Sequence, residues 1–454
     1  MKRTLIHNAT IVNEGHSQCG SVVIEDGRIA EVLIYKNEPS AKNEPSTPCD
    51  EVIDATGCYL LPGIIDDHVH FREPGLTRKA DILTESRAAA AGGVTSIMDM
   101  PNTNPQTTTL SALEEKFDLL NKKCIVNHSC YFGATNENYT EFGKLDKHRV
   151  CGIKLFMGSS TGNMLVDKTN SLLNIFDGTD MLIAAHCENQ DIINQNTKVN
   201  KEKYRNEPDI PIDKHPTIRS VTACYESSEL AVRMATIAGS RLHLLHVSTA
   251  RELQLLSDAP LAEKRITSEA CVGHLLFSFS DYATLGTRIK CNPAIKRKNN
   301  RDALRHAASI GIIDVIATDH APHLLDEKAG GALKAMSGMP MIQYSLVSML
   351  ELVDKGIFTI ETVVERMCHA PAVIFGIRQR GYIREGYQAD LVLVRHNEPW
   401  EVNANDILSK CGWSPLEGHT FQWKVEKTFA NGHLIYGDGQ VDDTYRGEEL
   451  RFDL

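Results

Sequence analysis

Short apolar runs recur through the middle of the chain, and amphipathic stretches separate most of them. A short apolar run bounded by glycine or polar residues is typical of a buried strand, whereas a longer stretch with apolar residues at helical spacing is typical of a helix that faces a core. The predicted strands are 60–66, 94–99, 124–129, 151–156, 181–185, 241–245, 265–269 and 312–317. The predicted helical stretches include 83–91, 110–121, 221–238, 250–257, 301–310 and 342–354.

This alternation of strand and helix favours an α/β fold with parallel strands. Eight such units in succession predict a (β/α)8 TIM-type barrel, which we place at residues 60–377. A doubly wound sheet is the alternative architecture. No GxGxxG sequence opens any of the helical stretches, however, which argues against a dinucleotide site.

The two ends of the chain have a different pattern, in which apolar and polar positions alternate between Gly-rich and Asn-rich turns. Such alternation is typical of antiparallel strands. The segments concerned are 4–13, 21–34, 381–395 and 427–439. We therefore expect 1–59 and 378–454 to form one small β-sandwich domain built from both termini. A repeated KNEPS sequence within 36–46 predicts a solvated loop.

The chain has 454 residues, of which 42% are hydrophobic and 24% charged, as is ordinary for a soluble globular enzyme. A net charge of −11 argues against nucleic acid as a partner, because backbone binding depends on an excess of Lys and Arg. The chain opens without a signal-peptide pattern and has no apolar run of about 18 residues, so we expect no membrane partner. The 12 scattered cysteines, with no CxxC pair, indicate reduced thiols and a cytoplasmic protein.

Potential metal ligands recur at the carboxyl ends of the predicted strands, where the active site of a barrel assembles. His68 and His70 follow the first strand and share one face, because side chains along a strand alternate with period two. An HxH pair alone also fits two hydrogen-bonded polar side chains. His186, His246 and Asp319 follow three other strands, and together the five residues predict a metal site.

Lys154 interrupts the apolar run 151–156. A lysine whose stem lies along apolar surface, or one paired with a carboxylate, is the ordinary interpretation. At the top of a barrel, however, burial disfavours the charged amine. A neutral amine can add CO₂ to give a carbamate, whose two oxygens can bridge two cations.

Six motifs together resemble the cyclic-amide branch of the amidohydrolase superfamily, and within it the dihydroorotases of the long class I type. The motifs are HVHFREPG (68–75), GVTSIMDMPNTNP (93–105), KLFMGSSTGN (154–163), AHCEN (185–189), LHVST (245–249) and ATDHAPH (317–323). The similarity spans nearly the whole chain and includes the divided β domain.

The resemblance implies two Zn²⁺ ions per subunit, bridged by carboxylated Lys154 and a hydroxide. The implied ligands of one ion are His68, His70, Lys154 and Asp319, and those of the other are Lys154, His186 and His246. Some class I relatives use an aspartate as the bridge and have no carboxylated lysine. The carbamate is therefore implied by Lys154 alone.

Arg72 follows His70 by two residues, so it shares the same face if the extended backbone continues. A guanidinium binds a carboxylate at two points, which suits a carboxylate-bearing substrate. The alternative places Arg72 on the surface of the turn at Pro74 and Gly75. By resemblance, the further substrate-binding residues are Asn102, Asn292 and His323.

The activity implied by the resemblance is the reversible cyclisation of N-carbamoyl-L-aspartate to (S)-dihydroorotate and water, the third step of de novo pyrimidine synthesis. The hydroxide between the metals would attack the ring amide, with Asp319 as general acid and base. The resemblance also implies a homodimer. The alternatives are an allantoinase, a hydantoinase or dihydropyrimidinase, whose chains lack an arginine at the position of Arg72, and an inactive paralogue that acts as a binding subunit.

Glu269 and His274 follow the seventh predicted strand. Orientation of active-site groups and plain structural support both fit these two residues. The Gly- and Lys-rich segment 324–337 is a plausible loop for closing over the substrate.

Overall fold

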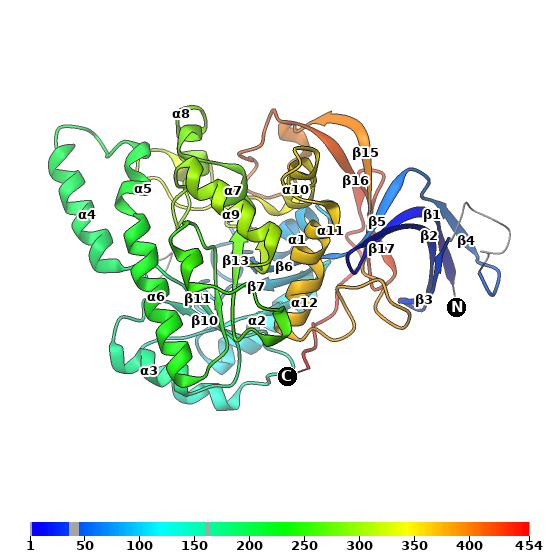
Figure 1. Cartoon of the computed structure of the whole chain (residues 1–454), viewed down its shortest axis with the longest axis horizontal. Coiled ribbons are helices and arrows are strands. Elements are labelled where there is room, and N and C mark those ends of the chain that lie inside the picture. Colours follow the sequence, from blue (N-terminus) through cyan, green and yellow to red (C-terminus); the bar gives the residue numbers. More distant parts are fainter. Residues whose placement is uncertain (1, 36–44, 159–163, 454) are drawn as a thin grey trace.

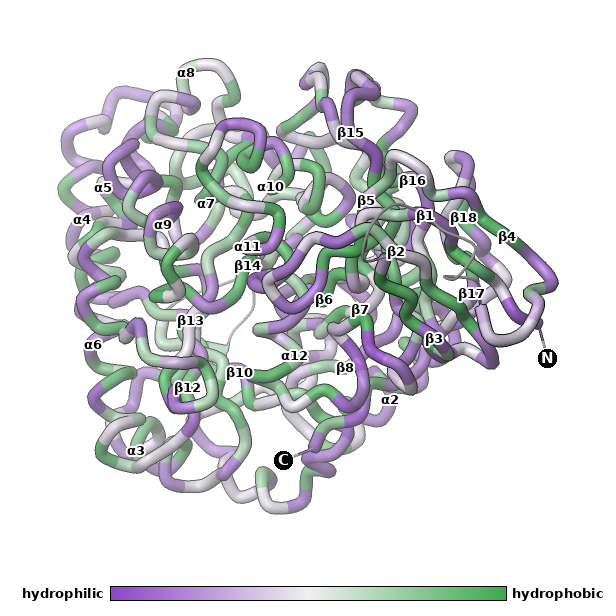
Figure 2. The backbone as a smooth tube through the Cα atoms, turned by 45° about the vertical axis from the view of Figure 1, so that its right-hand side comes forward, coloured by the Kyte–Doolittle hydropathy of each residue, from purple (hydrophilic) through white to green (hydrophobic). Residues whose placement is uncertain are grey.

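The computed structural model describes residues 2–35, 45–158 and 164–453 (Figure 1). Most of the repeated KNEPS segment and the last residues of the motif 154–163 lie outside the described residues. Figure 2 colours the backbone by hydropathy, and in β6 (Ile64–Val69) and β7 (Val94–Asp99) apolar residues stand beside hydrophilic ones although every residue of these two strands is buried. None of the helices in the described part of the chain has both the length and the apolar character needed to cross a bilayer.

Eight strand positions form the predicted barrel, and every pairing between them is parallel. After β6 and β7 come β8 (Asn127–Cys130) with β9 (Phe132–Gly133), β10 (Ile153–Phe156), β11 (Ile183–His186), β12 (Leu242–Leu244), β13 (Ile266–Cys271) and β14 (Val315–Ala317). The ring closes between its first and last strands, where the His70 amide donates to the His320 carbonyl at 2.8 Å. The (β/α)8 architecture is therefore confirmed.

Helices surround the barrel, and five of the six predicted helical stretches form helices. The longer ones are α1 (Ile82–Ala91), α2 (Leu110–Lys123), α3 (Thr169–Asp177), α4 (Gln190–Lys203), α6 (Val221–Ala238), α9 (Lys298–Ile310) and α10 (Ser345–Asp354). The shorter ones are α5 (His215–Ile218), α7 (Val272–Leu276), α8 (Tyr282–Leu285), α11 (Ile360–Val364) and α12 (Ala370–Phe375). Their ends follow local chemistry: the Ser220 side chain accepts from the Ala223 amide at the start of α6, and Gly239 ends this helix at φ 70°.

The predicted helix at 250–257 is wrong, because only a 3₁₀ turn over Glu252–Leu255 forms there. The Glu252 carboxylate accepts from the Thr249 hydroxyl and the Ser248 amide, so it folds back on the preceding loop. Pro260 follows closely and stands at the start of another short 3₁₀ turn. A helix therefore has no room to extend in this connection.

The predicted first strand, 60–66, is two strands. β5 (Cys58–Pro62) pairs with strands from both ends of the chain, whereas β6 belongs to the barrel. Gly63 separates them, and a Cβ at this position would lie 2.2 Å from the Thr95 hydroxyl oxygen, so only glycine fits. One apolar run therefore crosses from one sheet to another within a single residue.

Strands from the two ends form one nine-stranded sheet, shown at the right of Figure 1. Its members besides β5 are β1 (Arg3–Asn13), β2 (His16–Glu25), β3 (Arg28–Ile34), β4 (Glu51–Asp54), β15 (Leu391–Glu401), β16 (Thr420–Ala430), β17 (His433–Gly437) and β18 (Gln440–Val441). The sheet is antiparallel except where β1 pairs with β4 and β5, which confirms a mostly antiparallel sheet built from both termini. The division into 1–59 plus 378–454 and 60–377 stays a prediction, and β5 crosses its first boundary.

A buried ion pair fixes the chain just after β6. Asp99, the last residue of β7, accepts from the Phe71 amide at 2.9 Å and from the Lys116 ammonium group of α2. Lys116 also donates to the Glu73 carbonyl, and neither Lys116 nor Asp99 is exposed. The backbone on both sides of Arg72 is therefore tied to α2.

We expect Asp99→Ala to lower the free energy of unfolding by about 3–5 kcal/mol, because it leaves the Lys116 charge buried without its carboxylate. Urea denaturation measures this loss. The matched control is Asp302→Ala, which breaks the exposed pair with Lys298, whose side chains are 42% and 75% exposed. Its cost should stay below about 1 kcal/mol. Equal costs in the two variants would contradict the structural role of Asp99.

Candidate metal centre and substrate cavity

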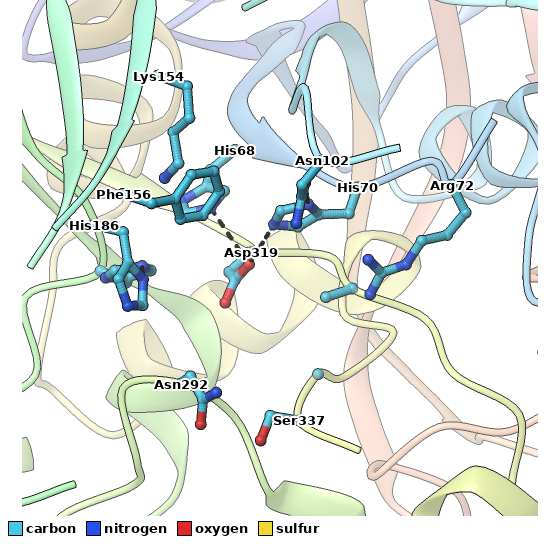
Figure 3. Close-up of a pocket in the computed structure, with 13 residues that line it drawn as sticks. His68, His70, Arg72, Asn102, Lys154, Phe156, His186, Asn292, Asp319 and Ser337 are labelled. Carbon is cyan, nitrogen blue, oxygen red and sulfur yellow. Dashed lines mark hydrogen bonds and ion pairs between the residues drawn. The ribbon is translucent and has the colours of Figure 1, made fainter. Parts of the chain in front are cut away.

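A small cavity opens at the carboxyl ends of the barrel strands (Figure 3). Its lining includes nine of the ten residues that the sequence singles out. These are His68, His70, Arg72, Asn102, Lys154, His186, His246, Asn292 and Asp319. The tenth, His323, lies outside the lining.

His68, His70 and Asp319 form the first cluster of candidate ligands. The Nε2 atoms of His68 and His70 lie 3.3 and 3.1 Å from the same Asp319 oxygen, and all three residues offer ligand atoms within 4.8 Å of one another. Asp319 has φ 47°, which is costly for a residue with a side chain. Strain of this kind concentrates at functional sites.

His186 and His246 form the second cluster, with His186 Nδ1 2.9 Å from His246 Nε2. The His246 ring centroid lies 5.3 Å from that of His68, so the two clusters are adjacent. His246 also has a left-handed backbone, with φ 39°. Five candidate ligands from four strand ends therefore converge on one point, as the sequence predicts.

The outward nitrogens of two of these rings form hydrogen bonds with acceptors. His68 Nδ1 lies 2.5 Å from a Glu269 oxygen, and His70 Nδ1 lies 2.8 Å from the Asn102 amide oxygen. His186 Nε2 lies 3.2 Å from a Glu188 oxygen, but this contact does not have the geometry of a hydrogen bond. A ring that donates from one nitrogen presents a lone pair from the other, and this is the arrangement that metal-binding histidines adopt.

Lys154 extends from β10 toward the space between His68 and His186 (Figure 3). Its side chain is buried, with the ammonium nitrogen 4.6 Å from the centroid of the Phe156 ring. Burial lowers the pKa of Lys154 to about 8, so a substantial fraction of the amine is neutral in mildly alkaline solution. This is the form that reacts with CO₂.

The donor set fits divalent cations. Burial lowers the pKa of His70 to about 4 and that of His246 well below its usual range, so both rings are neutral, as metal binding requires. Imidazole nitrogens with one carboxylate oxygen suit zinc and other borderline ions. The described residues therefore offer a candidate metal centre of the predicted composition.

Arg72 forms the opposite side of the cavity (Figure 3). It is buried, it has φ 67°, and its Nε donates to the Pro322 carbonyl at 3.1 Å. Burial lowers the pKa of Arg72 to about 10, which leaves the guanidinium charged at neutral pH. Among the residues that the structure describes, no carboxylate forms an ion pair with it. The surface-turn alternative for Arg72 is therefore wrong.

His323 supports Arg72 from behind. Its Nε2 lies 3.1 Å from Arg72 Nη2, and its Nδ1 lies 3.0 Å from the Lys79 ammonium group. Burial and these two cations lower the pKa of His323, so the ring is neutral. Direct contact between His323 and a substrate stays a prediction.

Three polar contacts of the site do not follow from sequence spacing. Asn102 lines the cavity, but its amide oxygen also orients His70. Glu188 belongs to the motif AHCEN (185–189), and the structure shows that its carboxylate faces His186 and Arg219. Glu269, for which two roles were open, lies against His68.

Phe156 and Ser337 also line the cavity, although the sequence analysis did not single them out. Phe156 follows Lys154 by two residues, so the alternation along β10 was an available signal. Ser337 is the last residue of the segment predicted to close over a substrate.

Comparisons with known proteins identify the family and relatives of this chain. Residues 59–435 match the amidohydrolase family. A dihydroorotase of Halobacterium salinarum is 32% identical over 94% of this chain and 98% of its own. An allantoinase of Bacillus velezensis is 29% identical over 96% of this chain and 94% of its own. The solved structure of an L-hydantoinase (dihydropyrimidinase) from Arthrobacter aurescens superposes with a TM-score of 0.89 at 26% identity, covering 97% of this chain and 98% of that one.

The barrel and its cluster of buried histidines define a hydrolase, and the chain belongs to the amidohydrolase family. Within this family it is similar throughout its length to enzymes named for cyclic amide substrates. It is a hydrolase that acts on cyclic amides.

We expect Lys154→Ala to bind less metal and to lose hydrolytic activity, because the residue between the two clusters is gone. Metal content after dialysis, measured by elemental analysis, tests the first part. If Lys154 is carboxylated, an excess of a small carboxylic acid should restore a little activity by replacing the carbamate oxygens. The matched control is Lys264→Ala, which removes another buried lysine that pairs with Asp314. Full metal content and normal turnover in Lys154→Ala would show that another residue links the two clusters.

Proposed function

We propose that this chain is a dihydroorotase, which closes N-carbamoyl-L-aspartate to (S)-dihydroorotate with loss of water and catalyses the reverse hydrolysis. The observation that carries the proposal is the buried guanidinium of Arg72 in the cavity wall. A buried charge is stable only when it is paired. Its bonded partners among the described residues are neutral, so the carboxylate of a bound substrate is the natural counter-ion.

Arg72 favours dihydroorotate over the other cyclic amides. Hydantoin and dihydrouracil rings carry no carboxylate, and neither does allantoin, so a guanidinium in the wall would remain unpaired with any of them. Sequence identity does not separate the candidates, because the dihydroorotase and allantoinase relatives are 32% and 29% identical. An inactive paralogue is disfavoured because all six proposed ligand positions are filled.

We propose that the site holds two zinc ions. Carboxylated Lys154 would link them. The first ion would take His68, His70 and Asp319 as further ligands, and the second would take His186 and His246. When bound, the two ions would supply Lewis acidity and lower the pKa of a water molecule between them.

The chain's own residues would position the substrate and move its proton. Arg72 would hold the substrate carboxylate on the far side of the cavity from Lys154, so that the amide reaches the centre. Asp319 would accept a proton at its carboxylate as water attacks the ring carbonyl, and would then return it to the departing ring nitrogen. In the biosynthetic direction the same carboxylate would act first as the acid. Asn292 faces this cavity with a buried amide oxygen that could accept from a ring N–H.

Three further predictions rest on the resemblance alone. They are a place at the third step of pyrimidine synthesis, a homodimeric assembly and a cytoplasmic location. The direct test of the proposed function is a comparison of turnover on dihydroorotate, hydantoin and allantoin, with metal content measured on the same sample. Faster turnover on hydantoin or allantoin than on dihydroorotate would overturn it.

We expect Arg72→Lys to lose about 10–150-fold in kcat/KM for dihydroorotate, since a lost charge-assisted hydrogen bond is worth about 1.5–3 kcal/mol. Lysine keeps the charge but cannot form the planar two-point pair with a carboxylate. Metal content should not change. Activity on dihydrouracil, which has no carboxylate, serves as the internal control and should change far less. Equal losses on both substrates would mean that Arg72 supports the metal centre instead.

We expect Asp319→Asn to retain some metal but to lose about 10²–10⁴-fold in turnover, because an amide can still coordinate weakly but cannot carry the proton. Both directions should be affected equally, which assays started from dihydroorotate and from N-carbamoyl-L-aspartate measure separately. A loss below about tenfold would identify another residue as the base.

A further inference from the structure

A single buried carboxylate lies beneath both clusters of candidate ligands. Glu269 belongs to β13, has no exposed surface and is not part of the cavity lining. Its Oε1 atom lies 2.5 Å from His68 Nδ1 and accepts from the His246 main-chain amide at 2.9 Å. His68 belongs to the first cluster and His246 to the second. One oxygen atom therefore contacts both halves of the centre.

The two contacts act on different parts of the ligands. The bond to His68 fixes the ring so that its Nε2 faces Asp319. The bond to His246 is made to the backbone, at a residue whose φ of 39° is unfavourable for a side chain. A conformation of this kind persists only where neighbouring groups hold it, and the Glu269 carboxylate is such a group.

The second oxygen of Glu269 faces a buried histidine without forming a hydrogen bond to it. Its Oε2 lies 3.6 Å from His243 Nε2, which in turn lies 3.3 Å from an Asp67 oxygen. The other nitrogen of His243 bonds to the Thr267 hydroxyl at 2.8 Å. Because all these side chains are buried, the Glu269 carboxylate has little freedom to rotate.

Glu188 provides a contrast. It lies 3.2 Å from His186 Nε2 and pairs with Arg219, so it supports the second cluster alone. Glu252 provides another, because it is equally buried but bonds to Ser228 and Thr249, away from the candidate ligands. The three residues are similar in burial and differ in which part of the centre they support.

We infer that Glu269 is a positioning residue that sets the spacing between the two cation sites, by fixing the His68 ring and the His246 backbone through one oxygen atom. The inference rests on the proposed binuclear centre. It requires that the loss of Glu269 weakens both cation sites together, whereas the loss of Glu188 weakens the second site alone. Supporting residues of metal ligands typically contribute about 10–100-fold to metal affinity.

The test uses the full chain, stripped of metal and titrated with Zn²⁺ against a chromophoric chelator, and separately with Co²⁺, whose visible spectrum reports coordination geometry. In Glu269→Gln we expect both dissociation constants to rise about 10–100-fold and the Co²⁺ spectrum to change. In Glu188→Gln one constant should rise. Glu252→Gln is the matched control, because it alters another buried carboxylate. In this variant both dissociation constants should equal those of the unaltered protein.

Glu269→Asp keeps the charge but is one methylene shorter, so it cannot reach His68 and the His246 amide together. It carries the test if Glu269→Gln does not fold, and we expect at least one constant to rise about tenfold. Unchanged constants in the Glu269 variants, or a rise at one site alone in Glu269→Gln, would overturn the inference. Binding of a single ion by the unaltered protein would overturn both the inference and the binuclear centre. If the unaltered protein binds two ions tightly but does not turn over dihydroorotate, the proposed substrate is contradicted. The two dissociation constants of the Glu269 variants still test the role of Glu269 in that case.

Discussion

The site depends on the closure of the barrel between its first and last strands. The His70 amide donates to the His320 carbonyl, and this bond joins the strand end that carries the HxH pair to the one that carries Asp319. These residues are about 250 positions apart in sequence, and nothing local could bring them within 3.1 Å. Parallel pairing around a complete ring places the remaining strand ends beside them.

The sequence predicts the ring of strands and the ligands that stand on it, because both follow from periodicity. Period-two alternation places His68 and His70 on one face, and the strand-end positions of His186 and His246 place these rings on the same rim. It does not predict the division of 60–66 into two strands, because a buried strand and its neighbour across Gly63 form one apolar run. Contacts such as Glu269 with His68 are likewise hidden, since spacing along a chain carries no distance across a barrel.

The histidines and the arginine of this cavity are positioned in two different ways. The His68 and His70 rings are oriented before any ion binds, because their outward nitrogens face a Glu269 carboxylate oxygen and the Asn102 amide oxygen. Arg72 differs, because hydrogen bonds hold the backbone on both sides of it while its guanidinium pairs with none of the described carboxylates. The proposed function assigns cations to the side of the cavity that carries the histidines, and a carboxylate to the side that carries Arg72.

The passage from β5 through Gly63 to β6 also determines how the chain can be divided. β5 is hydrogen-bonded on one side to β1 and on the other to β15, so it is an interior strand of the terminal sheet. Removing the chain ends to obtain a bare barrel would leave both edges of this strand open, one residue away from the strand that bears His68. Open strand edges recruit other chains and promote aggregation. The terminal sheet thus covers the edges of the strand next to the first barrel strand, and we expect the barrel to stay soluble only together with this sheet.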